Sequence, residues 1–184
     1  MTRLIAGTAG GRRLKVPRTG VRPTGDRARE ALFNSLGHLV ELPGAAVLDL
    51  YAGSGALGLE ALSRGAAAVT LVESSPRVLP VLEANVAAVG LPGARVLRGS
   101  VPTVVAGPAP SAYDLVLADP PYETPVDEVV GVLRSLVDGG WLAPGAVVVV
   151  ERSSRETEWE WPTPLVGLRE RRYGEAVLRY GSAP

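Results

Sequence analysis

Apolar and polar positions follow two alternating patterns along most of this chain, and together they predict an α/β fold. From residue 46 onward, short runs that are mostly apolar are separated by longer segments with apolar residues three and four positions apart. Unbroken apolar runs are typical of strands buried in a parallel sheet, and the wider spacing is typical of helices. The alternation therefore predicts a doubly wound, mostly parallel sheet. The expected strands are 46–50, 68–72, 95–97, 113–118 and 146–150, and the expected helices are 57–63, 76–89 and 127–137.

Shorter patterned segments flank this region at both ends. At the N-terminus, two apolar stretches lie on either side of a segment with three glycines, which predicts a β-hairpin, followed by a loop and a helix. At the C-terminus, two stretches flank Tyr173 and Gly174, which predicts an antiparallel pair. We expect two parts, a basic hairpin and loop over residues 1–25 and an α/β domain over 26–184. The expected elements are strands 3–6 and 12–16, a helix over 27–40 with Asp26 as its N-cap, and strands 164–171 and 176–180.

The composition fits one such domain and excludes several kinds of site. With 184 residues and 46% hydrophobic side chains, the chain can bury a full core. The absence of cysteine excludes disulfides and thiolate metal sites. The single histidine, His38, excludes a histidine cluster and is expected to be a surface or helix-packing residue. We see no signal peptide and no apolar run long enough to span a membrane, so we expect a cytoplasmic protein.

The charge is distributed unevenly, although the chain is formally neutral. Residues 1–29 carry eight basic side chains and one acid, a net charge of +7, which leaves −7 on the rest. A basic arm on an acidic body is typical of a protein that binds a polyanion such as a nucleic acid. We expect phosphate contacts from the basic residues of the hairpin, with a further candidate near the C-terminal turn. These candidates are Arg12, Arg13, Lys15 and Arg172.

A glycine-rich loop follows the first strand of the alternating region and precedes its first helix. Gly53, Gly55 and Gly58 match the G-x-G-x-x-G spacing of a dinucleotide site, where the backbone meets a pyrophosphate. Here, however, Asp49 ends the strand four residues before Gly53. A carboxylate at that place would repel phosphate and attract an ammonium group. The loop therefore predicts a ligand that brings an amine, and no phosphate, close to the backbone.

A second acid, Glu73, ends the next strand of the alternation. An acid at that place can accept hydrogen bonds from both hydroxyls of a ribose. A pocket that takes an amine and a ribose without a phosphate fits S-adenosylmethionine. The two strand ends together therefore predict a site for this cofactor.

A stiff turn follows strand 113–118. Consecutive prolines cannot continue a central strand because they lack N–H donors, so the chain must leave the sheet there. The turn brings together a carboxylate, a backbone carbonyl and an aromatic ring. Such a set can accept both N–H bonds of a planar amine and stack on its flat face. The residues of the turn are Asp119, Pro120, Pro121 and Tyr122.

Taken together, these features resemble the class I S-adenosylmethionine-dependent methyltransferases. Segment 49–55 resembles motif I, Glu73 resembles the ribose-binding acid, and turn 119–122 resembles motif IV of the enzymes that methylate amino groups. The N-terminal segments resemble a narrower group, the bacterial 16S rRNA guanine-N2 methyltransferases of the RsmD type, and this resemblance covers nearly the whole chain. The segments that carry it are 3–7, 11–14, 22–24 and 29–34.

The resemblance implies a Rossmann-like methyltransferase sheet of seven strands. It also implies transfer of a methyl group to the N2 amino group of a guanine in 16S rRNA, guanine 966, within the small ribosomal subunit or an assembly intermediate. Asp119 and the Pro120 carbonyl would hold the amino group, and Tyr122 would stack on the base. We expect a monomer that needs no metal. The cofactor-binding residues implied are Asp49, Gly53, Gly55, Glu73, Arg22, Thr24 and, at the position that faces the adenine, Ser100 or the backbone at Val101.

Three other functions remain open from the residues alone. A protein glutamine methyltransferase would use the same amine geometry, usually with Asn in place of Asp119 and a larger helical domain. A DNA adenine methyltransferase usually carries a target-recognition domain, for which 184 residues leave little room. A non-catalytic ribosome-assembly factor would not need acids at three strand ends, and a test of cofactor binding would separate it from the enzymes.

Overall fold

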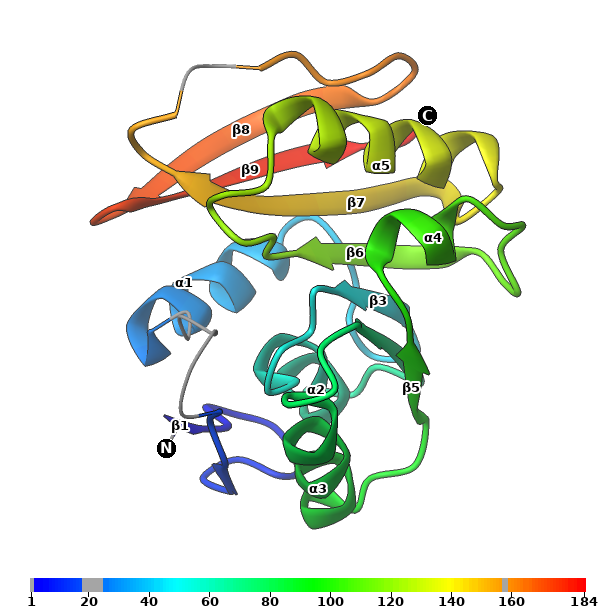
Figure 1. Cartoon of the computed structure of the whole chain (residues 1–184). Coiled ribbons are helices and arrows are strands. Elements are labelled where there is room, and N and C mark those ends of the chain that lie inside the picture. The colour runs from blue at the N-terminus through cyan, green and yellow to red at the C-terminus, as the bar shows by residue number, and fades with distance from the viewer. Residues whose placement is uncertain (1, 18–24, 157–158) are drawn as a thin grey trace.

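A seven-stranded sheet forms the centre of the computed structural model, which describes residues 2–17, 25–156 and 159–184 (Figure 1). The strand order is β5-β4-β3-β6-β7-β9-β8. The first five of these strands pair in parallel, and β9 is antiparallel to both of its neighbours. The predicted mostly parallel sheet and the closing antiparallel pair are thus confirmed. The bounds are β3 Ala46–Leu50, β4 Ala68–Glu73, β5 Ala94–Arg98, β6 Tyr113–Ala118, β7 Leu142–Ser153, β8 Val166–Tyr173 and β9 Ala176–Ser182.

Helices cover both faces of the sheet, as the doubly wound pattern requires. Successive residues of each strand point to opposite faces, and the core is accordingly split into two clusters. Val47 belongs to the cluster packed by α1, α2 and α3, whereas its neighbour Leu48 belongs to the cluster packed by α4 and α5. The bounds of the helices are α1 Asp26–Leu36, α2 Ala56–Ser63, α3 Leu79–Val89, α4 Val101–Val105 and α5 Val126–Asp138.

The N-terminal hairpin packs against α2 and α3. Its strands, β1 Thr2–Arg3 and β2 Arg13–Leu14, are shorter than the sequence predicts. Leu4 and Leu14 are fully buried in the cluster that contains α1, α2 and α3. The turn of the hairpin touches the end of α2 at Gly7, where an added Cβ would lie 1.8 Å from the carbonyl oxygen of Ser63.

A buried carboxylate, Glu60 of α2, joins the hairpin to the helical layer. Its side chain has no exposed surface. It accepts hydrogen bonds from the backbone N–H groups of Ile5 at 2.7 Å and Ala6 at 3.1 Å, and from Arg64 Nε at 2.7 Å. The guanidinium of Arg29, which is also fully buried, lies 3.8 Å away. Charged partners and backbone donors together compensate the loss of hydration of this carboxylate.

The buried amide of Asn85 makes a second connection, between the hairpin, α3 and the glycine loop. Its Oδ1 accepts the N–H of Lys15 at 2.9 Å, and its Nδ2 donates to the carbonyl oxygens of Lys15 at 2.9 Å and Ser54 at 2.8 Å. Three hydrogen bonds from one side chain thus tie the end of the hairpin to the loop that precedes α2.

The prediction that Asp26 caps helix α1 is wrong. Gly25 is the N-cap, and its carbonyl accepts the first helical hydrogen bond, from the N–H of Arg29 at 3.0 Å. Asp26 lies in the first turn instead, where the Thr2 hydroxyl donates to its carboxylate at 2.6 Å. This hydrogen bond and the nearby charge of Arg29 lower the pKa of Asp26 despite some loss of hydration. The helix also ends earlier than expected, at Leu36.

The remaining differences concern element boundaries and one short helix. Helix α4 was not predicted, because its five residues are too few to show a period. Strand β7 extends beyond the predicted 146–150 on both sides, and α3 begins at Leu79 rather than at residue 76. The side chain of His38 is exposed, as expected. Within the described residues, no helix has both the length and the apolar character needed to cross a bilayer.

Candidate active site

A cavity of about 1220 Å³ opens at the carboxyl ends of the parallel strands. Ligands of open α/β sheets bind at this edge, where the strand order reverses direction. Here the reversal lies between β3, which leads to β4, and β6, which leads to β7. The described lining contains seven carboxylates, and Arg77, which is exposed, is its only basic residue. The carboxylates are Asp49, Glu73, Asp119, Glu123, Glu128, Glu151 and Glu175.

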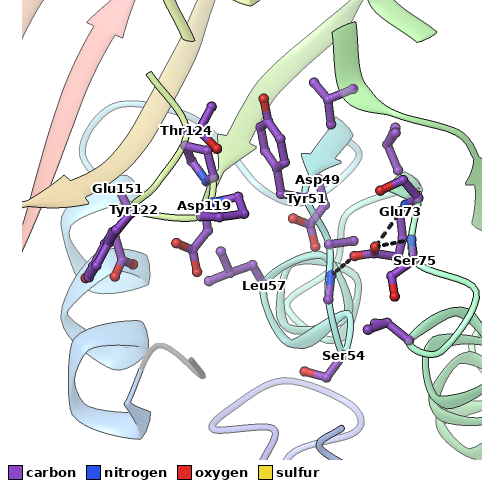
Figure 2. Close-up of a pocket in the computed structure, with 18 of the residues that line it drawn as sticks. Asp49, Tyr51, Ser54, Leu57, Glu73, Ser75, Asp119, Tyr122, Thr124 and Glu151 are labelled. Carbon is purple, nitrogen blue, oxygen red and sulfur yellow. Dashed lines mark hydrogen bonds between the residues drawn. The ribbon is translucent and has the colours of Figure 1, made fainter. Parts of the chain in front are cut away.

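Strand register places three of these acids in one row across the sheet. Leu50 pairs with Val72 and Ala118, and Ala118 pairs with Val150. The next residues along β4, β6 and β7 therefore lie in one row, in which adjacent strands are about 4.8 Å apart. These residues are Glu73, Asp119 and Glu151. Asp49 of β3 lies below this row, and Figure 2 shows Asp49 and Glu73 toward one end of the cavity and Asp119 and Glu151 toward the other.

Asp49 is buried beneath the glycine loop, with only 1% of its surface exposed. Its Oδ2 accepts the N–H of Gly58, in the first turn of α2, at 2.8 Å. Loss of hydration raises the pKa of Asp49 from 3.8 to about 7, although the hydrogen bond from Gly58 acts in the opposite direction and the charge of Glu73 adds to the rise. A carboxylate in this state is stabilised by a cation, such as the ammonium group of an amino acid.

Glu73 is held rigidly by three backbone donors. Its Oε2 accepts the N–H of Gly53 at 2.9 Å, and its Oε1 accepts those of Ser74 at 2.8 Å and Ser75 at 2.7 Å (dashed lines in Figure 2). Oε1 thus accepts two hydrogen bonds, whereas Oε2 accepts one and keeps a further lone pair, so the group can still accept a hydrogen bond from a ligand in the cavity. The arrangement fits a hydroxyl of a ribose.

The glycines of the loop have different physical reasons to be glycine. Gly53 lines the cavity, whereas Gly55 is not part of its lining. Gly55 adopts φ +81°, and an added Cβ would lie 2.6 Å from Leu82 of α3. A Cβ at Gly58 would lie 2.9 Å from the carboxylate of Asp49. Gly55 and Gly58 therefore allow α2 to pack closely against its neighbours, and direct backbone contact with a ligand is left to Gly53.

The turn after β6 opens onto the same cavity, and hydrogen bonds from Arg152 of β7 hold it in place. Arg152 is 1% exposed. Its guanidinium donates to the carbonyl oxygens of Thr124 at 2.7 Å and Pro121 at 3.3 Å, while Glu156 accepts from its Nε at 2.7 Å. These bonds fix the backbone of the segment that carries Asp119. No sequence pattern indicates these bonds, because they join residues about thirty positions apart.

Tyr51 lines the cavity between its two ends (Figure 2). It has φ +61°, a left-handed conformation that costs a residue with a side chain about 1 kcal/mol or more. Burial raises the pKa of its hydroxyl to about 12, with a further contribution from the charge of Glu128. Its buried hydroxyl has no hydrogen-bond partner among the residues that the structure describes. Strained backbone positions cluster at ligand-binding sites, which agrees with the place of Tyr51 in the lining of the cavity.

The structure brings most of the expected site residues together. The cavity is lined by the predicted catalytic residues of turn 119–122 and by Asp49, Gly53, Glu73 and Ser100. The Ser100 hydroxyl donates to Thr103 at 2.7 Å, and the backbone of Val101 lies beside it in the lining. Arg22 and Thr24 lie outside the described residues.

The basic candidates are exposed but do not share one environment. Arg12 donates to the carbonyl oxygen of Ala88 at 3.1 Å and to that of Val89, the last residues of α3. It therefore caps that helix as well as facing solvent. Arg13, Lys15 and Arg172 have exposed side chains.

Glu151 is a lining residue that the sequence analysis missed. It follows the apolar part of β7 just as Glu73 follows that of β4, so the same signal, an acid at the end of a buried strand, could have found it. It was overlooked because the antiparallel pattern begins there. Its side chain is 8% exposed and faces the cavity near Tyr122 (Figure 2).

Comparison with known proteins places the chain in a family. A family model described as "Conserved hypothetical protein 95" matches residues 2–182. The chain belongs to this family. Among its relatives is "Ribosomal RNA small subunit methyltransferase D" of Escherichia coli K12, which is 42% identical over 151 residues, covering 81% of this chain and 73% of the relative. "Putative rRNA methyltransferase YlbH" of Bacillus subtilis is 32% identical over 94% of both chains.

Solved structures support the same assignment. The "Putative methyltransferase yhhF" from Escherichia coli superposes with a TM-score of 0.87 and 38% identity, over 98% of this chain and 97% of that one. The chain is therefore an RsmD-type methyltransferase with the class I fold. S-adenosylmethionine is the methyl donor of this class, and the site fits it: a buried acid for the ammonium group, a fixed acid for the ribose, and no basic cradle for a phosphate in the described lining.

Proposed function

We propose that this enzyme transfers a methyl group from S-adenosylmethionine to the N2 amino group of a guanine in small-subunit rRNA, at the position equivalent to guanine 966. The names of the relatives, which are small-subunit rRNA methyltransferases, support the RNA class. One observation supports methyl transfer to an amine: turn 119–122 opens onto the cavity that Asp49 and Glu73 also line. A holder for a planar amine therefore faces the place of the methyl donor.

The residues of the turn would act on the amine in two ways. When bound, S-adenosylmethionine supplies an electrophilic methyl group on its sulfonium. The carboxylate of Asp119 and the carbonyl of Pro120 each accept one N–H of the amine, so that its lone pair points toward the cofactor end of the cavity. Positive charge develops on nitrogen during transfer, and both acceptors favour it. Asp119 is also positioned to take the proton that the nitrogen releases.

The base must leave its helical stack, or lie in an open loop, to reach this cavity. The ring of Tyr122, half-buried at the rim, provides the surface on which the flipped base stacks. Exposed Arg13 and Lys15 on the hairpin, with Arg12 and Arg172, would bind phosphates and supply affinity without reading sequence. The enzyme would act in the cytoplasm as a monomer, and its substrate would be rRNA, either free or within the small subunit.

The decisive experiment combines labelled S-adenosylmethionine with 16S rRNA, with small ribosomal subunits and with DNA, followed by digestion and mass spectrometry of the nucleosides. N2-methylguanine in one of the two RNA samples is the expected product. N6-methyladenine, or label in a protein glutamine, would replace the substrate assignment. Absence of any cofactor binding by calorimetry would favour a non-catalytic assembly factor.

Two variants test the role of the turn. Asp119→Ala should abolish methyl transfer and leave the affinity for the cofactor within a few-fold of the original, because Asp119 lies at the other end of the cavity from Glu73. Glu123→Ala, which removes an exposed acid from the same segment, is the matched control and should keep most activity. Turnover near normal in Asp119→Ala would rule out the assigned role.

A further inference from the structure

The turn that holds the amine does not by itself distinguish among substrates. Asp119 and the carbonyl of Pro120 can accept two N–H bonds from any planar amine, whether it belongs to adenine, cytosine, guanine or a glutamine side chain. The proposed specificity for guanine therefore needs another group in the cavity. That group must recognise something beside the amine.

Guanine differs from the other candidates in the atom next to its amino group. In guanine, N1 carries a hydrogen and donates, so N1 and the amine together present three N–H bonds side by side. In adenine and cytosine, the ring nitrogen next to the amine has a lone pair and accepts. In a glutamine side chain, the neighbour is a carbonyl oxygen, which also accepts. An additional hydrogen-bond acceptor beside Asp119 would therefore favour guanine alone.

The structure provides such an acceptor at Glu151. Ala118, the last residue of β6, pairs with Val150 in parallel register, and paired strands lie about 4.8 Å apart. Asp119 and Glu151 are the residues that directly follow this pair, so they are neighbours at the edge of the sheet. Both continue the strand alternation of Leu117 and Val149, which point to the face packed by α1, α2 and α3. Their side chains thus enter the cavity from the same side, and both are part of its lining.

The low exposure of Glu151 strengthens the electrostatic interaction of its carboxylate with a bound substrate. With 8% of its surface exposed, it has little water to screen it. Its place is fixed by the neighbouring Arg152, which binds the carbonyl oxygens of Pro121 and Thr124 and so ties β7 to the segment that carries Asp119. Two acids side by side repel each other. A substrate edge with three N–H bonds relieves that repulsion, and each carboxylate has lone pairs enough to accept from it in addition to any bond within the protein.

We propose that Glu151 makes the site selective for guanine by accepting the N1–H bond beside the amine held by Asp119 and Pro120. This inference rests on the proposed function and names the specificity determinant of the same site. Against adenine or cytosine, the Glu151 carboxylate would meet a lone pair instead of a donor, and the two would repel each other in a buried place. Sites built to bind a substrate N–H reject analogues that lack it by about 10⁴-fold or more.

The test uses 2-aminopurine, which keeps the amine at carbon 2 but has a lone pair at N1. The substrate is rRNA ligated from a synthetic piece with guanine or 2-aminopurine at the methylated position, used in the form, free or assembled, that accepts guanine. The wild-type enzyme should prefer guanine by about 10³-fold or more in kcat/KM. A preference below about tenfold would overturn the inference even without a variant.

Glu151→Gln should narrow this preference by about tenfold or more, because the amide can turn its N–H toward the lone pair of 2-aminopurine. Glu123→Gln, an exposed acid of the same lining, should leave the ratio unchanged. An equal fall in activity on both bases, or an unchanged ratio, would overturn the inference, since a structural role affects both substrates alike. Failure of the wild-type enzyme to methylate guanine at all would overturn the proposed function itself, and this inference with it.

Discussion

Replacement of Asp49 by Asn should stabilise the ligand-free protein at alkaline pH and weaken its binding to the cofactor. The side chain is 1% exposed, and its pKa is raised from 3.8 to about 7 by loss of hydration. In the unfolded chain the same carboxyl ionises near 3.8. As pH rises from about 4 to about 7, the unfolded state therefore loses its proton before the folded state does, and folding stability falls.

The size of this effect follows from the two pKa values. Each pKa unit corresponds to about 1.36 kcal/mol, so the ionised form is buried at a cost of about 4 kcal/mol when pH lies above 7. Between pH 5 and pH 8 the wild-type protein should lose about 2 to 3 kcal/mol of stability through this group alone. Every other titrating group is common to the wild type and Asp49→Asn, so its contribution cancels in their difference. The amide oxygen of the variant can still accept from Gly58.

Urea denaturation at pH 5, 6, 7 and 8, followed by tryptophan fluorescence, to which the buried Trp141 contributes, measures the difference. The stability of Asp49→Asn relative to the wild type should rise by about 2 to 3 kcal/mol across this range and level off above pH 7. A difference that stays constant within about 0.5 kcal/mol would refute the reasoning, because it would mean that Asp49 is ionised in the folded protein throughout.

Cofactor binding supplies an independent check on the same group. At pH 6 about nine in ten folded molecules carry a protonated Asp49, and an ammonium group bound beside it should drive that proton off. Calorimetry of S-adenosylhomocysteine, which carries the same ammonium, in buffers of different ionisation enthalpy should show release of nearly one proton at pH 6 and almost none at pH 8.5. Asp49→Asn should release none at either pH.

Three further predictions test the scaffold around the site. Arg152→Lys should lower kcat roughly 10- to 100-fold, because lysine cannot donate to both carbonyl oxygens of the turn as the planar guanidinium does, and cofactor affinity should change little. Equal effects on kcat, measured by kinetics, and on cofactor affinity, measured by calorimetry, would contradict this. Glu60→Gln should cost about 3 kcal/mol in urea denaturation, whereas Glu83→Gln, in an exposed pair, should cost less than about 0.5 kcal/mol. Reversing the charges of Arg13 and Lys15 should weaken RNA binding and flatten its dependence on salt; an unchanged slope would show that the hairpin faces away from the RNA.

The centre of the fold could be predicted well because its signals in the sequence are local. Strands 46–50 and 113–118 are observed to the residue, since each is a mostly apolar run next to a turn signal, Pro43-Gly44 before the first and the proline turn at 119–122 after the second. The predicted cap of α1 was wrong because the carboxylate of Asp26 accepts a hydrogen bond from Thr2, which lies far away in the sequence. The five residues of α4 carry no period that could reveal a helix.

The candidate site divides in the same way. The strand-end rule located Asp49, Glu73 and Asp119, since an acid at or near the carboxyl end of a buried parallel strand lies at the same edge of the sheet. The count of basic residues was less informative about location. Arg29 is wholly buried beside Glu60, and Arg12 caps α3, so part of the N-terminal positive charge serves the fold. The number of charged side chains can be counted from a sequence, but tertiary packing decides whether each of them faces solvent or the protein.

The amide of Asn85 has a consequence for how far the enzyme can reach. One face of it holds the backbone of Lys15, on the exposed hairpin, and the other holds Ser54, in the loop over the cofactor end of the cavity. The hairpin therefore cannot swing without disturbing that loop. Under the proposed function, a phosphate bound at Lys15 would lie at a fixed distance from the cofactor end of the cavity, so the nucleotide would be selected by its distance along the RNA before any contact with the base.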